Sequence, residues 1–417
     1  MPTKTRTTAT SRLGGWLPWD QDALHAWLQD LGQQAESSTE PQLHPVIGEF
    51  RMLIEQDPIV RLYLTEMIRQ VPTSGKYRKH HLKSVDQMLQ LINAVLGRAP
   101  EYDHTAMVGT PLNAIFDWCM GTPAGFGAFR NDAINAMLKK ILTAWCEFLS
   151  SEQSLYVLNE TPRGWKCAAA QRAMKMHEYE YDPDDQYWGF TSWNDFFTRR
   201  FKDGRRPIAE PDNDKVIVSA CESTPYRIMA QVKKQDRFWI KSQPYSLQDM
   251  LASPELVDQF VGGTVYQAFL SALNYHRWHS PISGTVVKAF VKQGTYYSET
   301  EAEGEDPAGP DDSQGYIAHV ATRAIIVIEC DDPSIGLMAV IQVGMSEVSS
   351  CVIRPEIKPG HPVKKGDELG WFQFGGSTYC LVFRPGAIAS FALQAIPEPY
   401  NPRAPLVLLG TPIATAS

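Results

Sequence analysis

The sequence predicts an α+β protein in which a helical N-terminal domain is followed by a β-rich C-terminal domain. Up to about residue 200, apolar residues recur at the three-and-four spacing of amphipathic helices. Beyond that point the chain changes to short β-branched runs separated by Gly, Pro, Asp and Asn. An acidic, Pro-containing stretch at residues 179–186 lies between the helical pattern and the strand pattern and is a candidate hinge. We therefore expect a helical domain over residues 20–185 and a β-rich domain over residues 190–417, since a domain commonly spans roughly 100–200 residues.

Three segments of the first half carry the helical pattern. Residues 45–71 and 81–96 place apolar side chains on one helical face. Residues 131–149 do the same, and Asn131 and Asp132 are candidates for the N-cap of this helix. Pro and Gly residues between these segments mark their ends. The first half is therefore expected to be a set of amphipathic helices.

The second half is expected to form strands, with one helix among them. Residues 246–256 carry the helical pattern. Residues 297–315 are acidic and poor in apolar side chains, so we expect a solvated loop there. The strands are expected at residues 215–220, 285–291, 324–329, 337–343 and 379–383.

Composition and charge argue against two broad classes of protein. The net charge of −8 and the pI near 5.7 disfavour a general nucleic-acid binder, which would carry a basic face. No stretch reaches the ~18–20 apolar residues that a membrane helix needs, so no integral membrane segment is expected. Seven cysteines at irregular spacing, without a CxxC pair, predict reduced thiols and a cytoplasmic protein. Residues 1–12 are basic and lack acids, which is typical of either a disordered tail or a mitochondrial presequence.

A Gly-Gly-Ser sequence lies between two strongly apolar, aromatic segments in residues 371–383, WFQFGGSTYCLVF. Gly and Ser are common turn residues, so a tight turn is the simple structural interpretation. The chemical alternative is specific. A Gly-Ser bond held between buried strands brings the serine hydroxyl against the preceding carbonyl, and glycine permits this approach because it has no side chain. Ser377 is therefore a candidate nucleophile, and the bond between Gly376 and Ser377 is a candidate cleavage site.

Two histidines lie three positions apart in residues 274–284, NYHRWHSPISG. His276 and His279 belong to an aromatic-rich segment that leads into a Pro-containing turn. They fit a packed pair, a zinc pair or catalytic bases. No further Cys or His cluster follows at ligand spacing, which disfavours zinc. Packing and catalysis both stay open for this pair.

Glu222 ends an apolar strand in residues 216–225, VIVSACESTP. A lone Glu at a strand end is commonly a solvated residue at the rim of a sheet. A serine hydroxyl, an imidazole and a carboxylate are nevertheless the three parts of an acyl-transfer triad. Serine is a weak nucleophile until a neighbouring base takes its proton, and the carboxylate fixes that base. The sequence thus supplies Ser377, two histidines and Glu222 as one possible set.

Several ordered motifs resemble the phosphatidylserine decarboxylase family of pyruvoyl enzymes. The resemblance runs from about Trp193 to Phe383, nearly half of the chain. Each motif alone is a weak signal, but their number and their order make the signal strong. The helical first half and the motif variants are similar to a soluble fungal branch that includes tryptophan decarboxylases. The motifs are WNDFFTRRF, RRPIAEPD, VSACES, KSQPYSLQDML, NYHRWHSPISG and GDELGWFQFGGST.

The resemblance implies a role for each candidate residue and a β-rich pyruvoyl decarboxylase domain as the second half. Ser377 matches the family serine that becomes the pyruvoyl group. His279 matches the base for self-cleavage, and His276 matches the histidine implicated in decarboxylation. Glu222 stands at the position of the family's triad aspartate, with a side chain one methylene longer. The resemblance implies no metal.

Two departures from the family pattern concern the substrate. Asn274 replaces the aspartate that usually precedes Tyr-His. Residues 344–350, GMSEVSS, differ from the usual G-A-x-x-V-G-S stretch near the active site and introduce Glu347. These differences are compatible with self-cleavage, but they weaken the case for phosphatidylserine as the substrate.

The implied chemistry needs no pyridoxal phosphate. The Ser377 oxygen attacks the Gly376 carbonyl, and cleavage leaves a covalent pyruvoyl group on a C-terminal chain of residues 377–417. This short chain is expected to stay associated with the N-terminal chain as its partner. A substrate amine then forms a Schiff base with the pyruvoyl ketone, which accepts electrons as CO2 leaves. His276 is the candidate for protonating the resulting carbanion.

A free aromatic L-amino acid is the expected small-molecule partner, with L-tryptophan to tryptamine as the first choice. Two alternatives stay open. One is a phosphatidylserine decarboxylase that makes phosphatidylethanolamine. The other is a non-catalytic lipoyl- or biotinyl-like binding module, suggested by residues 360–370, GHPVKKGDELG. In that segment, Lys364 and Lys365 lack the usual context of a modified lysine.

Overall fold

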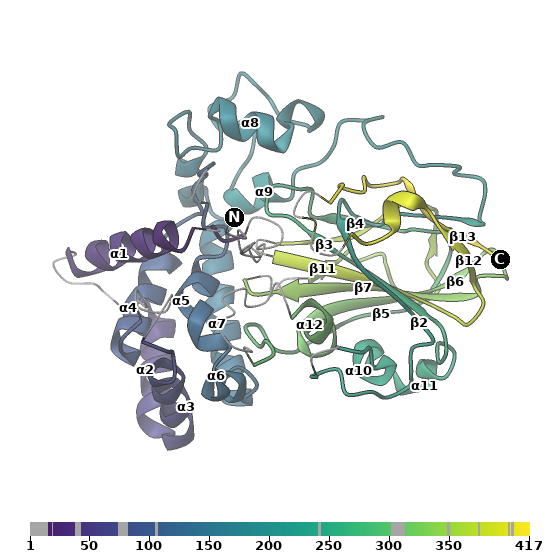
Figure 1. Cartoon of the computed structure of the whole chain (residues 1–417). Helices are drawn as coiled ribbons and strands as arrows, with labels where there is room; N and C mark the ends of the chain where they lie inside the picture. Colours follow the sequence, from purple (N-terminus) through teal and green to yellow (C-terminus); the bar gives the residue numbers. More distant parts are fainter. Residues whose placement is uncertain are drawn as a thin grey trace, which may run out of the picture.

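The chain consists of a helical half and a β-rich half that lie side by side (Figure 1). The structure is a computed structural model. It describes residues 16–18, 20–37, 43–73, 82–104, 107–240, 243–301, 313–347, 351–373, 376–398, 401 and 404–417. The predicted α+β class, with helices first and strands second, is confirmed. The basic tail lies outside the described residues.

The first predicted helix is two helices in the structure. α2 (Pro45–Gln56) and α3 (Pro58–Arg69) are separated at Asp57, whose side chain accepts hydrogen bonds from the first turn of α3. Proline cannot continue a helix from its N-terminal side, because it lacks the N–H group and clashes with the preceding turn. The prediction of one continuous helix over residues 45–71 is therefore wrong at Pro58.

The other two predicted helices are present, although the one expected over residues 81–96 begins at Val85. α4 (Val85–Leu96) begins after Ser84, whose hydroxyl accepts a hydrogen bond from the N–H of Gln87. α7 (Asp132–Leu149) is capped by Asn131, as predicted. α1 (Gln21–Ser37) buries Leu24, Leu28 and Leu31 at helical spacing. The other described helices before residue 200 are α5 (Pro111–Met120), α6 (Pro123–Ala128), α8 (Ala168–Met174) and α9 (Trp193–Phe197), with short 3₁₀ turns η3 (Glu152–Val157) and η4 (Met176–Glu178).

An antiparallel seven-stranded sheet forms the centre of the β-rich half, in the order β2-β3-β11-β7-β6-β5-β9. Four predicted strands, at residues 285–291, 324–329, 337–343 and 379–383, lie in this sheet, whereas the fifth, at residues 215–220, lies in a smaller sheet. β6 and β7 read as continuous apolar runs because both faces of these strands are covered. β11 lies inside the sheet, between β3 and β7. The strands are β2 (Thr224–Ala230), β3 (Thr264–Leu270), β5 (Gly284–Lys292), β6 (Arg323–Cys330), β7 (Leu337–Met345), β9 (Pro362–Val363) and β11 (Gly376–Phe383).

Two smaller sheets flank the large one, in the orders β1-β13-β12 and β4-β10-β8. The second of these carries both the histidine box and the segment that leads into β11. Their strands are β1 (Val216–Val218), β4 (Arg277–His279), β8 (Cys351–Ile353), β10 (Glu368–Phe372), β12 (Ile388–Phe391) and β13 (Pro412–Ala416), with a 3₁₀ turn η6 (Leu393–Ala395) between the last two.

Two expectations for the second half need correction. The helix predicted at residues 246–256 is broken into α10 (Leu247–Leu251) and α11 (Pro254–Val257), since Pro254 starts a new helix. The solvated loop predicted at residues 297–315 is buried at its first end, where Tyr297 is 1% exposed. At its other end the chain enters α12 (Gln314–Val320). Residues 302–312 lie outside the described part of the chain.

One hydrophobic cluster spans both halves, and a second lies within the β-rich half. The first cluster runs from Trp16 through the helices to side chains of β6, β7 and β11. Tyr179, at the start of the expected hinge, is buried and stacks on Phe201 with ring centroids 4.5 Å apart. That end of the stretch is therefore packed rather than free. The domain boundary between residues 185 and 190 stays a prediction.

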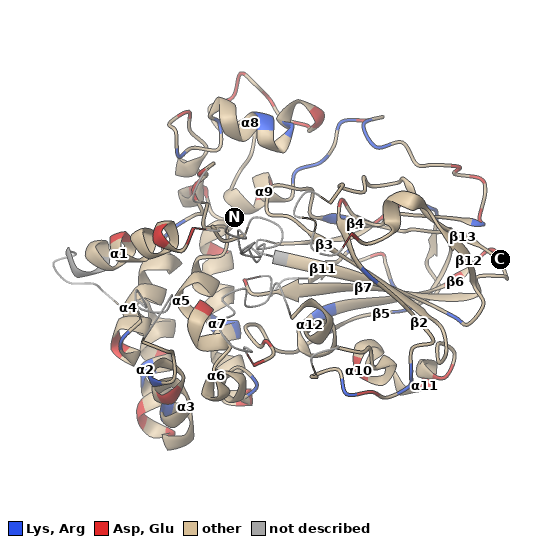
Figure 2. Cartoon of the chain, viewed as in Figure 1, with Lys and Arg blue, Asp and Glu red and all other residues tan. Residues whose placement is uncertain are grey.

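Charged residues of both signs are interspersed over helices and loops, while β3, β7 and β11 are largely free of charge (Figure 2). No described helix is long and apolar enough to cross a membrane. All seven cysteines are free thiols.

Candidate active site

Ser377 is the second residue of β11 and lies at the end of the large sheet that faces the helical half (Figure 1). Its register partners are Leu270 on β3 and Gly344 on β7. The residue has no exposed surface, and its hydroxyl has no hydrogen-bond partner among the described residues. The next residue differs, because the Thr378 hydroxyl donates to the Ala268 carbonyl at 2.9 Å. Buried polar atoms are nearly always paired, so the unpaired hydroxyl marks Ser377 as a functional candidate.

His276 is fully buried among aromatic rings. It stacks on Phe197 at a centroid distance of 4.2 Å and meets the edge of Trp16 at 5.6 Å. Its Nδ1 lies 2.9 Å from the Asn274 carbonyl oxygen, which can only accept, so Nδ1 carries the proton. Burial, with a contribution from Arg199, lowers the pKa of His276 to about 3. The ring is therefore neutral, and its Nε2 lone pair has no partner in the described part of the chain.

Two hydrogen bonds connect the surroundings of this histidine to the Ser377 region. The N–H of Phe372, five residues before Ser377, donates to the His276 carbonyl at 2.9 Å. The indole N–H of Trp16 donates to the carbonyl of Leu270 at 3.0 Å, on the register partner of Ser377. Trp16 of the helical half thus contacts both the histidine box and the residue of β3 that is paired with Ser377. Sequence reasoning missed Trp16, because nothing local indicates a contact with residue 270.

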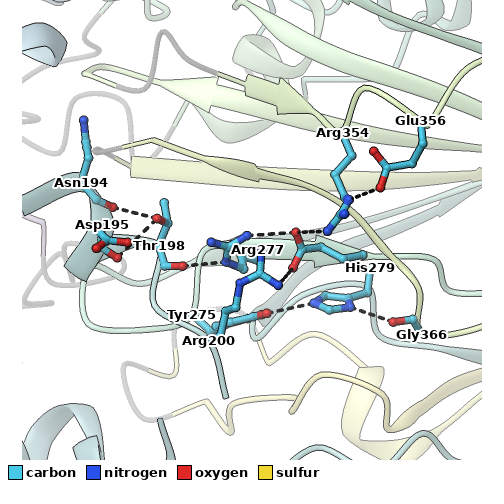
Figure 3. A network of polar contacts seen from close by, with 11 residues as sticks. Asn194, Asp195, Thr198, Arg200, Tyr275, Arg277, His279, Arg354, Glu356 and Gly366 are labelled. Atoms are coloured by element: carbon cyan, nitrogen blue, oxygen red, sulfur yellow. Dashed lines mark hydrogen bonds and ion pairs between the residues drawn. The ribbon is translucent and has the colours of Figure 1, made fainter. Parts of the chain in front are cut away.

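His279 is held between two oxygen atoms (Figure 3). Its Nδ1 donates to the Gly366 carbonyl at 2.8 Å, so its Nε2 accepts from the Tyr275 hydroxyl at 3.0 Å. Burial lowers the pKa of His279 below its usual range, although the bond to Gly366 opposes this. The imidazole is therefore neutral, with Nε2 as its basic nitrogen. Tyr275 occupies that nitrogen.

A cluster of charges lies beside His279 (Figure 3). Glu368 on β10 is the register partner of His279 and is ion-paired with Arg277 at 2.9 Å and Arg354 at 3.1 Å. Arg200 lies 3.5 Å from the other oxygen of the same carboxylate. Glu368 belongs to the GDELG motif, but no local pattern of residues singles it out as a site residue.

Glu222 has a different partner from the one expected. It is 3% exposed and forms an ion pair with Arg206, which also pairs with Glu178 at 2.7 Å. The described residues show no hydrogen bond between Glu222 and His279. A buried guanidinium needs a counter-charge more than a neutral imidazole does, and this accounts for the pairing. The backbone still brings the two segments together, since the N–H of His279 donates to the Ala220 carbonyl at 2.9 Å.

Comparison with known proteins identifies the chain's relatives. A phosphatidylserine decarboxylase family model matches residues 193–397, and a second phosphatidylserine decarboxylase model matches residues 44–174. Decarboxylase iboD of Amanita muscaria is 40% identical over 303 residues, which cover 68% of this chain and 86% of that protein. L-tryptophan decarboxylase of Psilocybe cubensis is 32% identical over 405 residues, covering 91% of this chain and 90% of that protein.

This chain belongs to the phosphatidylserine decarboxylase family. The resemblance to the fungal branch of the family is thereby confirmed. A more distant member, phosphatidylserine decarboxylase proenzyme 3 of Schizosaccharomyces pombe, is 32% identical over 205 residues, or 49% of this chain and 20% of that protein. Members of the family are pyruvoyl-dependent carboxy-lyases, and this chain is a carboxy-lyase.

The residues of this family member fit a serine-derived pyruvoyl group. Ser377 is preceded by a glycine, lies inside a sheet and has a buried hydroxyl without a protein partner in the described region. No group of three His, Cys, Asp or Glu side chains in the described ranges could hold a metal ion. A cavity of about 360 Å³ is lined only by residues up to Arg163, so it is not formed by the sheet that carries Ser377.

Proposed function

We propose that this chain cleaves itself between Gly376 and Ser377 and uses the resulting pyruvoyl group to decarboxylate a free aromatic L-amino acid. L-tryptophan, giving tryptamine, is the first choice of substrate. The observation that carries the proposal is the unpaired, fully buried hydroxyl of Ser377 in an interior strand. Neither His276 nor His279 belongs to a group of described side chains that could hold a metal ion.

The maturation step begins when His279 Nε2 takes the proton of the Ser377 hydroxyl. The oxygen attacks the Gly376 carbonyl carbon, the peptide C–N bond breaks, and an ester forms as the nitrogen takes up a proton. Elimination across the Cα–Cβ bond of residue 377 then releases the Gly376 carboxylate. Water hydrolyses the resulting enamine to a ketone, with ammonia as the leaving product. In this scheme Tyr275 must first release Nε2.

In this proposal Glu222 does not contact the reacting atoms and acts indirectly, by positioning His279. Its ion pair with Arg206 fixes the segment whose Ala220 carbonyl binds the backbone of His279. Replacement of Glu222 or His279 should therefore slow or abolish cleavage, and Glu222→Asp should retain part of it. Normal maturation of both Glu222→Gln and His279→Ala would eliminate these two assignments.

In the decarboxylation step, the pyruvoyl ketone supplies an electron sink once the substrate amine has condensed with it. His276 can relay a proton through Nε2, which carries a lone pair because the Nδ1 proton is fixed on the Asn274 carbonyl. In this proposal Nε2 first takes up a proton and then delivers it to the carbanion. Phe197 and Trp16 exclude water from the ring of His276. Pyridoxal phosphate has no part in this scheme.

The substrate proposal is supported by the relatives that match most of the chain. Two Psilocybe proteins named L-tryptophan decarboxylase are 32% and 33% identical over 91% and 89% of this chain. The phosphatidylserine decarboxylase proenzyme 3 cited above matches only 49% of it. A cytoplasmic location, with an amino acid as the small-molecule partner, stays a prediction.

The alternative of a non-catalytic lipoyl- or biotinyl-like module is wrong, because the relatives are decarboxylases. Lys365 is also unsuited to modification. It is 6% exposed, and its ammonium group donates to the carbonyls of Glu210 and Asn213 at 2.9 and 2.7 Å.

The test of the proposed substrate measures CO2 release from tryptophan, phenylalanine, tyrosine, free serine and phosphatidylserine in mixed micelles. We expect turnover of the free aromatic amino acids, tryptophan first, without detergent or lipid. Ser377→Ala should stay as one inactive chain. Hydroxylamine or phenylhydrazine should inactivate the wild type by trapping the ketone. Turnover of phosphatidylserine alone would contradict the proposed substrate, but it would not contradict the assignment of a pyruvoyl cofactor.

A further inference from the structure

Glu347 is a buried carboxyl group for which the proposed function has no role. It lies two residues after β7 and is 4% exposed. Its Oε1 accepts a hydrogen bond from the N–H of Asn113 at 2.8 Å. Its Oε2 has no hydrogen-bond partner among the described residues. Since unpaired buried polar atoms are rare in native proteins and each needs an explanation, Oε2 points to a ligand group as its missing partner.

The turn that carries Glu347 is fixed against the N-terminus of α5. Ser346 has a positive φ of 56°, and its hydroxyl donates to Oδ1 of Asn113 at 3.0 Å. The N-cap residue of α5, Thr110, makes no side-chain cap hydrogen bond, so Glu347 takes that role from a distant part of the chain. The free N–H groups and the dipole of a helix N-terminus stabilise a carboxylate. Among the side-chain hydrogen bonds of the described residues, the carboxyl group is thus held through Oε1, and Oε2 is left without a partner.

Strand register places this turn near the proposed pyruvoyl position. Met345 is the register partner of Gly376, and Gly344 is the register partner of Ser377. Partners in antiparallel strands have Cα atoms about 5 Å apart, and two further residues span at most about 7 Å. The Cα atom of Glu347 therefore lies within about 12 Å of the cleavage site, which a substrate and a glutamate side chain together can bridge.

The surroundings of Glu347 keep water away and carry little charge. Burial raises its pKa to about 8, against the lowering effect of backbone N–H groups, including those of Asn113 and Leu112. Tyr297 is the titratable side chain of the described region whose pKa responds to Glu347. Phe116 packs on that tyrosine with ring centroids 5.0 Å apart. No charged side chain contributes to the pKa shift of Glu347.

We propose that Glu347 is the base that takes a proton from the α-ammonium group of the amino-acid substrate. This inference rests on the proposed function, because it requires a ketone at position 377. An ammonium group has no lone pair, so it must lose a proton before its nitrogen can attack a carbonyl carbon. In this step one N–H bond of the substrate breaks and one O–H bond forms at Oε2. The products are a neutral amine and a neutral carboxylic acid.

This role accounts for the unpaired oxygen and for the depth of the carboxyl group. An ammonium group is the natural partner of a buried carboxylate, and the two neutralise each other on proton transfer. A base is most effective when its pKa lies near the working pH. A purely structural cap would need only Oε1, which a glutamine side chain also provides.

The test compares Glu347→Gln with the wild type. Glutamine keeps the size of the side chain and an oxygen that can accept from the Asn113 N–H, but it cannot accept the substrate's proton. We expect kcat/KM near pH 7 to fall at least 100-fold, within the range known for general bases. Glu347→Asp, a shorter base, should retain part of the activity. Glu66→Gln, an equivalent change on the surface of α3, is the matched control and should leave kcat/KM within twofold.

Two further readouts separate a base from a residue that merely shapes the site. Hydroxylamine is already unprotonated near pH 7, so it should inactivate Glu347→Gln and the wild type at equal rates. The kcat/KM of the variant should rise about tenfold per pH unit until the substrate's ammonium group is deprotonated. The proposal would be overturned if Glu347→Gln lowered the rate of inactivation by hydroxylamine as much as it lowers kcat/KM for the amino acid. Parallel pH profiles of kcat/KM for the variant and the wild type would overturn it as well.

If Glu347→Gln fails to cleave itself, the pH profile of kcat/KM of the wild type still tests whether Glu347 is the base. With Glu347 as base, kcat/KM requires a carboxylate and an ammonium together, so it should fall above the pKa of the substrate's ammonium group. A profile that rises to a plateau at high pH would contradict the proposal. The mass of the C-terminal chain tests the proposed function separately, because it reports the pyruvoyl group whatever the pH profile shows.

Discussion

The backbone N–H of Asn113 donates a 2.8 Å hydrogen bond to Oε1 of Glu347, across 234 positions of sequence. This bond joins the first turn of α5 to the turn that follows β7, whose last residues pair with Gly376 and Ser377. The indole of Trp16 makes a second such connection at Leu270. The helical half therefore completes the surroundings of Ser377 from both neighbouring strands.

Tyr275→Phe should speed self-cleavage. The hydroxyl of Tyr275 occupies His279 Nε2 at 3.0 Å, and its removal frees the lone pair that the proposed base needs. A neutral hydrogen bond contributes about 0.5–1.5 kcal/mol, so the cleavage rate should rise about 2- to 10-fold. Pulse-labelled protein followed on denaturing gels measures this rate. Slower cleavage in this variant would contradict the assignment of His279 as the base.

His276→Ala should mature into two chains but lose at least 100-fold in kcat. Its neutral ring, with the pKa lowered to about 3, should give no ionisation of its own in the kcat profile between pH 5 and 9. Comparison of gel mobility with CO2 release separates the two steps. A variant that stays uncleaved would show that His276, rather than His279, serves maturation.

Glu222→Gln should destabilise the protein by about 2–3 kcal/mol. It leaves the buried Arg206 with Glu178 as its remaining partner, so the cost should lie below that of breaking a buried pair completely. Denaturant unfolding is measured in the Ser377→Ala background, where the chain stays in one piece. Glu255→Gln, which removes an exposed pair with Lys288, is the control and should cost less than about 1 kcal/mol. Equal costs for the two variants would be inconsistent with a buried ion pair.

Glu347 should make the protein less stable as pH rises from about 4.5 to 8. Its pKa is raised from the ordinary 4.5 to about 8, so the folded state holds a proton that the unfolded state has lost. The free energy of unfolding should therefore fall by up to about 1.4 kcal/mol per pH unit in this window, and level off above it. Glu347→Gln in the Ser377→Ala background removes this component. A constant difference between the two proteins from pH 5 to 8 would rule out the raised pKa.

The sequence predicted local features well and remote partners poorly. The continuous apolar runs of β6 and β7 identified buried strands, and Asn131 identified the start of α7. Apolar periodicity predicted single helices over residues 45–71 and 246–256, but each is divided in the structure, at Pro58 and at Pro254. Burial of Tyr297 was not predictable, because its acidic neighbours resemble a solvated loop while its ring packs on Phe116 from the other half.

The same limit applies to the site. The motifs located Ser377, His276, His279 and Glu222, and the structure shows that all but His279 are almost fully buried. The pairing of Glu222 with Arg206 could not be read from the motifs, since it depends on which charges burial brings together.

Intact mass spectrometry of the purified wild-type protein tests the central claim most directly. We predict two chains, the smaller covering residues 377–417 and lacking one nitrogen and three hydrogens relative to a chain that starts with serine. Borohydride should add two hydrogens to this smaller chain by reducing its ketone. A fully active protein with one uncleaved chain and an ordinary serine at position 377 would contradict the account.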